Sequence, residues 1–157
     1  MVARFWRYQK EYFRDRPEIF ERSERGEGRP PVFLRHADAY NVITVPGISG
    51  DDRNRLLGEI PARERHRWFR SMSSSQAIAL SVFGNLKMYG LLDLLNELHD
   101  EQGCPIFGDG TITSENFRME YKIKSLGEPR PTSLDAFIPG KHPVAIECKL
   151  TEPDVGS

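Results

Sequence analysis

Apolar and polar residues alternate over residues 117–126 and 144–150, which is the pattern of a half-buried β-strand. A third strand-like stretch, TSLDAFI, lies between them at 132–138. The turn-forming sequences GEPRP and PGKHP separate the three stretches in order. The pattern therefore predicts a three-stranded antiparallel meander in the second half of the chain.

A helical pattern precedes these strands, over residues 73–103. Serines supply N-cap candidates at its start, and an apolar stripe recurs at helical spacing: Leu80, Phe83, Leu91, Leu94, Leu95 and Leu98. We expect Gly84 and Gly90 to kink or divide the helix, because glycine costs about 1 kcal/mol in a helix interior. We expect Gly103 to end it. Such a stripe usually belongs to a core, so the helix should lie against the sheet.

The first half of the chain has weaker patterns. They predict a helix up to about Arg14 that Pro17 interrupts, a short strand over 40–45, a helix over 53–60 capped by Asp51 or Asp52, and a helix over 62–72. We therefore divide the chain into a largely helical, Arg-rich N-terminal region, residues 1–71, and an α/β core, residues 72–157.

The composition is that of a globular protein that can bury a core, with 38% hydrophobic and 29% charged residues. No segment approaches the roughly 18 consecutive apolar residues that a membrane span requires. Charges and aromatics occupy the N-terminus, where a secretion signal needs an apolar run. Two cysteines are too few for a disulfide framework. We expect a cytoplasmic protein with no membrane partner.

Positive charge is concentrated in the N-terminal region. Residues 1–70 hold 15 of the 22 Lys and Arg and carry a net charge of +4, whereas residues 71–157 carry −5. Four arginines surround Trp68 and Phe69: Arg63, Arg65, Arg67 and Arg70. Arginine with aromatics can contact a phosphate backbone and stack on bases. The alternative is a solvated helix crossed by salt bridges.

The length of the last turn determines which polar side chains face each other. If PGKHP closes a five-residue hairpin loop, residue i faces residue 282 − i, and Asp135 lies opposite Glu147. The Cβ atoms of opposed residues are about 4.5–5.5 Å apart. Two carboxylates that close repel each other unless a positive group lies between them. Lys149, on the same face, could partly supply it, and a divalent cation would serve better.

A divalent cation at this position would support phosphodiester chemistry. Mg²⁺ takes oxygen ligands, commonly one or two carboxylates, and leaves other positions for water and phosphate. Mn²⁺ is a possible substitute. Lys149 could orient or deprotonate the attacking water, or stabilise the developing negative charge. The alternative is an exposed strand face with a Glu–Lys pair and an unrelated aspartate.

The sequence SLDAFI, followed after eight residues by ECK, resembles the PD-(D/E)xK nuclease superfamily, which has the restriction-endonuclease-like fold. SSSQAIALSVFGNL, with ECKLTE downstream, is similar to a largely uncharacterised bacterial nuclease-like group in that superfamily. The resemblance covers about residues 72–155. It implies metal-ligand roles for Asp135, Glu147 and the backbone carbonyl of Cys148. It also implies a catalytic role for Lys149.

Two features depart from the superfamily pattern. Leu134 replaces the proline of the superfamily's name, and many members lack that proline. The superfamily core runs α-β-β-β-α-β, yet the chain stops eight residues after Lys149, before the second helix and the final strand. We therefore expect a fragment or a natural truncation. Its exposed apolar face would favour a homodimer or need a missing C-terminal portion to complete it.

The resemblance predicts a Mg²⁺-dependent endonuclease that acts on DNA. Glu120 could bind a second metal or orient water, and Gln76 could reach the site or DNA. The alternatives are a cross-strand pair between Glu120 and a lysine, and an ordinary polar helix residue at Gln76. A competing interpretation is a catalytically inactive nuclease-fold module that binds DNA or a protein partner. A hydrolase of RNA or small nucleotides would use the same site.

Overall fold

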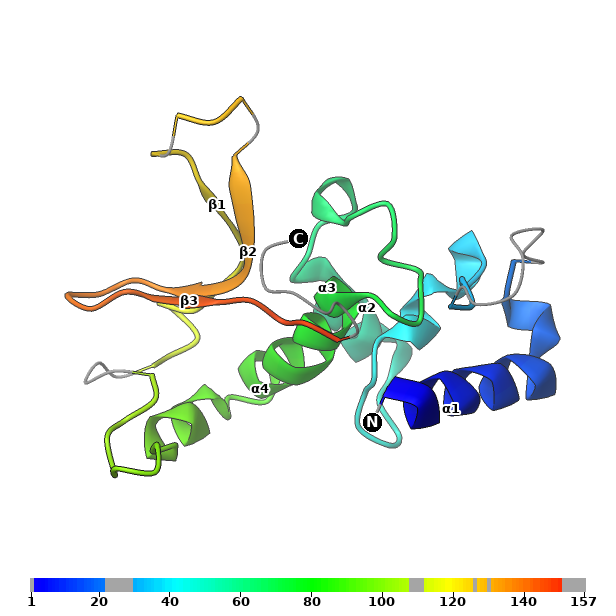
Figure 1. Cartoon of the computed structure of the whole chain (residues 1–157), viewed down its shortest axis with the longest axis horizontal. Helices are drawn as coiled ribbons and strands as arrows, with labels where there is room; N and C mark the ends of the chain where they lie inside the picture. Colours follow the sequence, from blue (N-terminus) through cyan, green and yellow to red (C-terminus); the bar gives the residue numbers. More distant parts are fainter. Residues whose placement is uncertain (1, 22–29, 108–111, 126, 130, 151–157) are drawn as a thin grey trace.

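The structure, a computed structural model, describes residues 2–21, 30–107, 112–125, 127–129 and 131–150. Figure 1 shows α1 on one side of the molecule, the sheet on the other, and the other labelled helices between them. The labelled elements are α1 (Val2–Asp15), α2 (Gly50–Gly58), α3 (Ser75–Ala79), α4 (Asn85–Met88), β1 (Arg118–Ile123), β2 (Thr132–Ile138) and β3 (Val144–Ile146). Short 3₁₀ helices cover Pro17–Ile19, Arg35–Asn41, Ala62–Glu64 and Leu92–Glu97.

The three strands form an antiparallel sheet in the order β1-β2-β3, as the alternating pattern predicts. The β2–β3 pairs are Ala136 with Ile146, Phe137 with Ala145 and Ile138 with Val144. Each pair sums to 282, so the register expected from a five-residue loop is confirmed over this stretch. β3 is shorter than the predicted strand over 144–150, because regular pairing stops at Ile146.

The predicted helix over 73–103 is divided at its glycines. Ser74 caps α3 by accepting the Ala77 N–H at 3.2 Å, a π turn over Leu80–Gly84 joins α3 to α4, and the helical run stops before Gly90, whose φ is +67°. The expectation that it continues to Gly103 is wrong. A separate 3₁₀ helix covers Leu92–Glu97.

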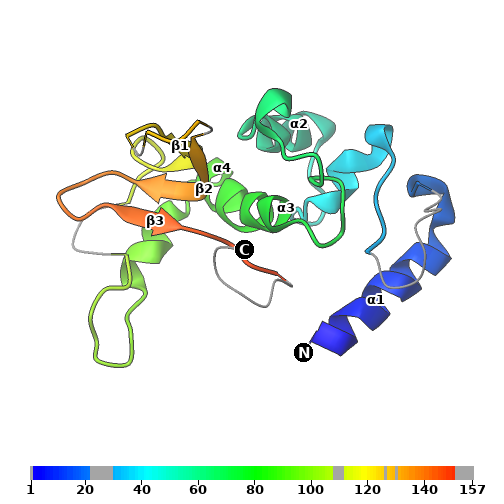
Figure 2. The same cartoon turned by 45° about the horizontal axis from the view of Figure 1, so that its top comes forward.

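The helical run from α3 to α4 packs between the sheet and α2 (Figure 2). One face carries Ala79 and Phe83, which share a buried cluster with Ala136 and Ile138 of β2. The other face carries Leu80, which packs with Leu56 of α2. The apolar stripe is thus core in its first part, but in its second part three leucines are 44–46% exposed: Leu91, Leu94 and Leu98.

Gly84 allows this helix to approach α2 closely. A Cβ at this position would lie 2.6 Å from Leu80 Cδ1 and 2.7 Å from Leu56 Cδ1. Both leucines are fully buried, so their side chains have little room to move. Gly84 has a low helix propensity, but the close packing of the helix against α2 requires a residue without a side chain there.

Predictions for the first half of the chain were partly wrong. The helix that ends near Arg14 is confirmed as α1, but 40–45 forms no strand and the helix over 62–72 is only the turn Ala62–Glu64. Tertiary hydrogen bonds hold the end of the second stretch: the Asn41 side-chain amide donates to the carbonyls of Phe69 and Ser71, at 2.6 and 2.7 Å. The cap of α2 is Ser49, which accepts the Asp52 N–H, and not Asp51 or Asp52.

None of the helices in the described part of the chain has the length and apolar character that crossing a bilayer demands.

Replacing Gly84 with valine should lower the free energy of unfolding by about 1–3 kcal/mol, because the added methyls would overpack the contact with Leu56. Gly58→Ala is the matched control, since a Cβ there meets nothing within 4 Å and helix propensity improves. Urea denaturation measures both variants. A Gly84→Val chain as stable as the parent would contradict this packing.

Candidate functional site

Asp135 lies at the centre of β2, a strand that bends sharply along its length (Figure 1). It is 8% exposed, although its neighbours Ser133 and Glu147 are exposed. Its Oδ2 accepts the backbone N–H of Cys148 at 2.7 Å. A carboxylate buried this deeply needs such a donor, and a hydrogen bond to a charged acceptor is roughly twice as strong as a neutral one. A side chain thus replaces strand pairing just after β3.

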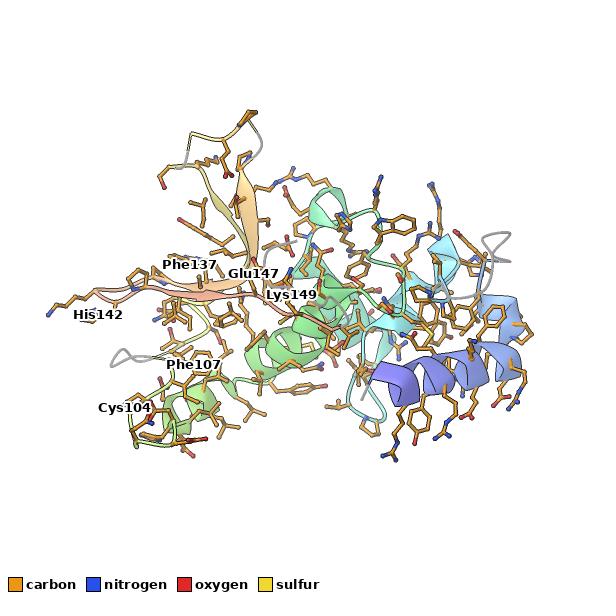
Figure 3. The ribbon with its side chains drawn as sticks, viewed as in Figure 1. Cys104, Phe107, Phe137, His142, Glu147 and Lys149 are labelled. Carbon is orange, nitrogen blue, oxygen red and sulfur yellow. The ribbon has the colours of Figure 1, made fainter. Side chains whose placement is uncertain are left out.

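Glu147 and Lys149 lie on the segment that follows β3 and leads toward α3 (Figure 3). Both are exposed, whereas Cys148 between them is half-buried against the core cluster of the sheet. Burial raises the pKa of the Cys148 thiol to about 11, and the Asp135 and Glu147 carboxylates add to this shift. Cys148 therefore lies near the Asp135 carboxylate as well as beside Glu147, its neighbour in the chain.

Glu120 joins this group from β1. Its φ of +49° lies in the left-handed region, which is uncommon for a residue other than glycine. The alternation of the strand is broken there: Tyr121 is 38% exposed and stacks on Phe137, with ring centroids 4.2 Å apart. The alternation over 117–126 predicts that Tyr121 shares one face with Phe117 and Met119, and this prediction is wrong because the strand changes direction at Glu120.

The Glu120 carboxylate is half-buried and accepts hydrogen bonds from Gln76 and from Ser133 Oγ, the latter at 2.8 Å. Burial raises the pKa of Glu120, and the negative charges of Asp135 and Glu64 act in the same direction. The two hydrogen bonds oppose this shift. The structure thus brings Glu120 next to Asp135.

Gln76 is 7% exposed and connects three segments. Its Oε1 accepts the His66 N–H at 2.8 Å, and its Nε2 donates to the Glu64 carbonyl at 3.2 Å. It also hydrogen-bonds to Glu120. Glu64 in turn forms an ion pair with Lys122 of β1. Sequence reasoning missed Glu64, because no local spacing relates residue 64 to residue 122.

The four arginines singled out from the sequence fall into two groups. Arg65 and Arg70 are 18% and 22% exposed and hold the fold together. Arg65 donates to Asp38 at 3.2 Å and to two backbone carbonyls, while Arg70 pairs with Glu21 and donates to the Phe33 carbonyl at 2.7 Å. Arg63 and Arg67 are exposed.

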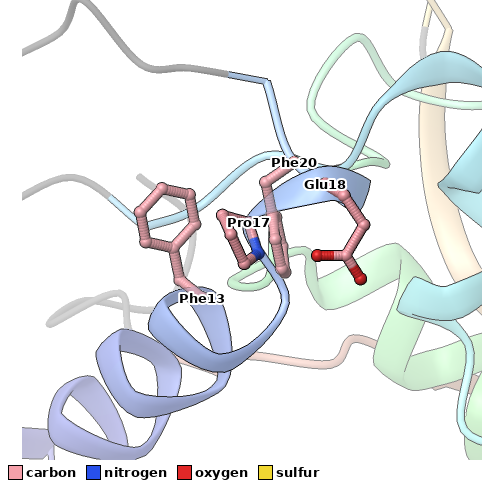
Figure 4. Close-up of a pocket in the computed structure, with 4 residues that line it drawn as sticks. All are labelled: Phe13, Pro17, Glu18 and Phe20. Carbon is pink, nitrogen blue, oxygen red and sulfur yellow. The ribbon is translucent and has the colours of Figure 1, made fainter.

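Other features of the described residues offer less. A hollow of about 490 Å³ lies at the end of α1, lined by Phe13, Pro17, Glu18 and Phe20 (Figure 4). It lies on the opposite side of the molecule from the sheet (Figure 1). In the same described ranges, no three His, Cys, Asp or Glu side chains gather closely enough to hold a metal ion by themselves. The hairpin remains the strongest candidate site.

Comparison with known proteins identifies one family. The family described as Restriction Endonuclease associating with ARP matches residues 36–157. The match includes the helical run, all three strands and every residue of the candidate site. No curated protein and no solved structure matches the chain.

Glu120→Gln should stabilise the fold at neutral pH, and the gain should shrink as the pH falls. Burial raises the pKa of Glu120 in the folded chain, so the ionised carboxylate destabilises the fold. This destabilisation is absent below the unfolded pKa of about 4.3 and is complete above the folded pKa. Urea denaturation across this range measures the effect.

Glu97→Gln is the control for this experiment, because Glu97 is exposed and its replacement should change stability by less than about 0.5 kcal/mol. A Glu120→Gln chain whose stability relative to the parent does not vary with pH would contradict the assigned environment of Glu120.

Proposed function

Because the chain belongs to the family described as Restriction Endonuclease associating with ARP, we propose that it is a metal-dependent nuclease that hydrolyses phosphodiester bonds in DNA. One observation carries the proposal. Asp135 is buried in β2 and accepts the Cys148 N–H, which brings its carboxylate next to the 147–149 segment that carries Glu147 and Lys149. Asp135, Glu147 and Lys149 could together bind a cation and act on a phosphate at the protein surface.

The chemistry of the donors fits a hard divalent cation. Asp135, Glu147 and the backbone carbonyl of Cys148 supply only oxygen ligands, which Mg²⁺ prefers and which Mn²⁺ also accepts. Two carboxylates suffice, because Mg²⁺ usually keeps several water or phosphate oxygens. When bound, the cation would stabilise charge on the phosphate and lower the pKa of the attacking water.

The remaining roles fall to side chains on the same hairpin. Lys149 is exposed two residues after Glu147, where its amine could orient the water, accept its proton or stabilise the developing charge. The hydrogen bond from Cys148 fixes the orientation of Asp135. Gln76 and Ser133 hold Glu120 beside it, where a third carboxylate could orient a water molecule.

A second candidate function is a catalytically inactive nuclease-fold module that binds DNA or a protein partner. One observation favours it: the family description names an association with ARP. For such a module, DNA affinity would not depend on divalent metal. Asp135→Asn would also raise stability in the absence of magnesium, because it removes repulsion between carboxylates.

Lys149→Ala should reduce Mg²⁺-dependent cleavage of plasmid and single-stranded DNA by at least about 100-fold, because one proton-transfer or charge-stabilising group contributes at least that much. Calorimetric titration with Mg²⁺ should show binding that is largely unchanged. Lys141→Ala is the control, since Lys141 is an exposed lysine of the hairpin loop. Cleavage retained by the Lys149→Ala chain would rule out the assigned mechanism.

A further inference from the structure

The partly buried Arg65 and the buried Phe69 hold the segment 63–68 on the surface. Arg65 is anchored to Asp38 and to the carbonyls of Leu57 and Ile60, at 3.2, 2.8 and 3.0 Å. Its guanidinium carbon lies 5.1 Å from the ring centroid of Phe69, which is 2% exposed. Three exposed residues lie between these anchors: His66, Arg67 and Trp68.

The exposed residues combine an aromatic surface with positive charge. The guanidinium carbon of Arg67 lies 5.3 Å from the Trp68 ring centroid, and Trp68 is 38% exposed. The Arg63 side chain is 85% exposed, and its Nε forms a surface ion pair with Glu64 at 3.3 Å, which a phosphate could replace. An indole can stack on any nucleobase, and guanidinium groups bind phosphates. The combination is typical of surfaces that hold single strands.

The same segment is fastened to the candidate site. The His66 N–H donates to Gln76 Oε1 at 2.8 Å, and Gln76 also hydrogen-bonds to Glu120. The Glu64–Lys122 ion pair adds a second link to β1. Two side chains, Gln76 and Glu120 of β1, therefore connect the exposed segment to Asp135 of the hairpin.

We propose that segment 63–68 holds a single strand of nucleic acid beside the hairpin site, with Trp68 stacking on a base and Arg63 and Arg67 contacting phosphates. This inference rests on the proposed function and specifies its substrate: a strand whose bases are unpaired near the site. In a duplex each base face is already covered by its neighbours, so Trp68 would have nothing to stack on. Single-stranded ends, loops and gaps present such faces.

Fluorescence anisotropy with a labelled single-stranded oligothymidine tests the inference. All chains carry Lys149→Ala and the buffer contains no divalent metal, so that binding is measured without cleavage. Trp68→Ala should weaken binding by about 5- to 100-fold, as loss of one stacked base does, and Trp68→Phe should retain most of the affinity. Replacing Arg63 and Arg67 together with alanine should lower the salt slope by about 1.4, because each phosphate contact to a single strand contributes roughly 0.7.

Arg14→Ala is the control, because the Arg14 side chain is 75% exposed but lies on α1, at the far side of the molecule (Figure 1). It should leave the salt slope nearly unchanged. Unaltered affinity in the Trp68→Ala chain would overturn the inference. Tighter binding of the parent to a duplex of the same length would overturn it too.

The binding measurement tests the inference, and the cleavage measurement tests the proposed function, so each proposal can be contradicted without the other. Binding that depends on Trp68 in a chain that never cleaves DNA would support the inference while removing the proposed nuclease activity. Cleavage of single-stranded DNA that is unaffected by Trp68→Ala or by loss of both arginines would retain the nuclease and overturn the inference.

Discussion

The hydrogen bond from the Cys148 N–H to the Asp135 carboxylate determines the arrangement of the site. Regular pairing of β2 with β3 stops at Ile146, and two residues later a side chain takes the place of the partner strand. This bond gives the buried Asp135 carboxylate a hydrogen-bond donor in place of water, and it fixes the path of the chain after β3. Glu147 and Lys149 are exposed because Cys148, between them, turns its side chain toward the core.

Gln76 provides the second constraint, because it ties three distant parts of the sequence together. It contacts the backbone at residues 64 and 66 and the Glu120 carboxylate. A buried polar network of this kind is stable only when its members are satisfied. The left-handed conformation of Glu120 persists in this setting, since two hydrogen bonds hold its side chain toward Asp135. The same hydrogen bonds therefore place the Glu120 carboxylate near Asp135 and accompany its left-handed backbone conformation.

Local patterns predicted the hairpin well and the tertiary links poorly. The length of the PGKHP loop sets the register, and the turn sequences GEPRP and PGKHP predict the bounds of β2, because both depend on neighbouring residues. The helix expected over 62–72 does not form, and a distant residue holds the end of that stretch instead: the Asn41 side chain donates to the carbonyls of Phe69 and Ser71. Arg65 and Arg63 look equivalent in sequence, yet one is anchored in the protein and the other is exposed. Charge patterns do not distinguish these cases.

The most direct test of a cation site at the hairpin is anomalous diffraction from crystals of the chain grown with Mn²⁺. The proposed site predicts one strong peak that contacts the Asp135 and Glu147 carboxylates and the backbone carbonyl of Cys148, at oxygen–metal distances of about 2.1–2.3 Å. The peak should disappear in the Glu147→Ala chain. A well-ordered hairpin without a peak, or a peak held by other side chains, would contradict the account.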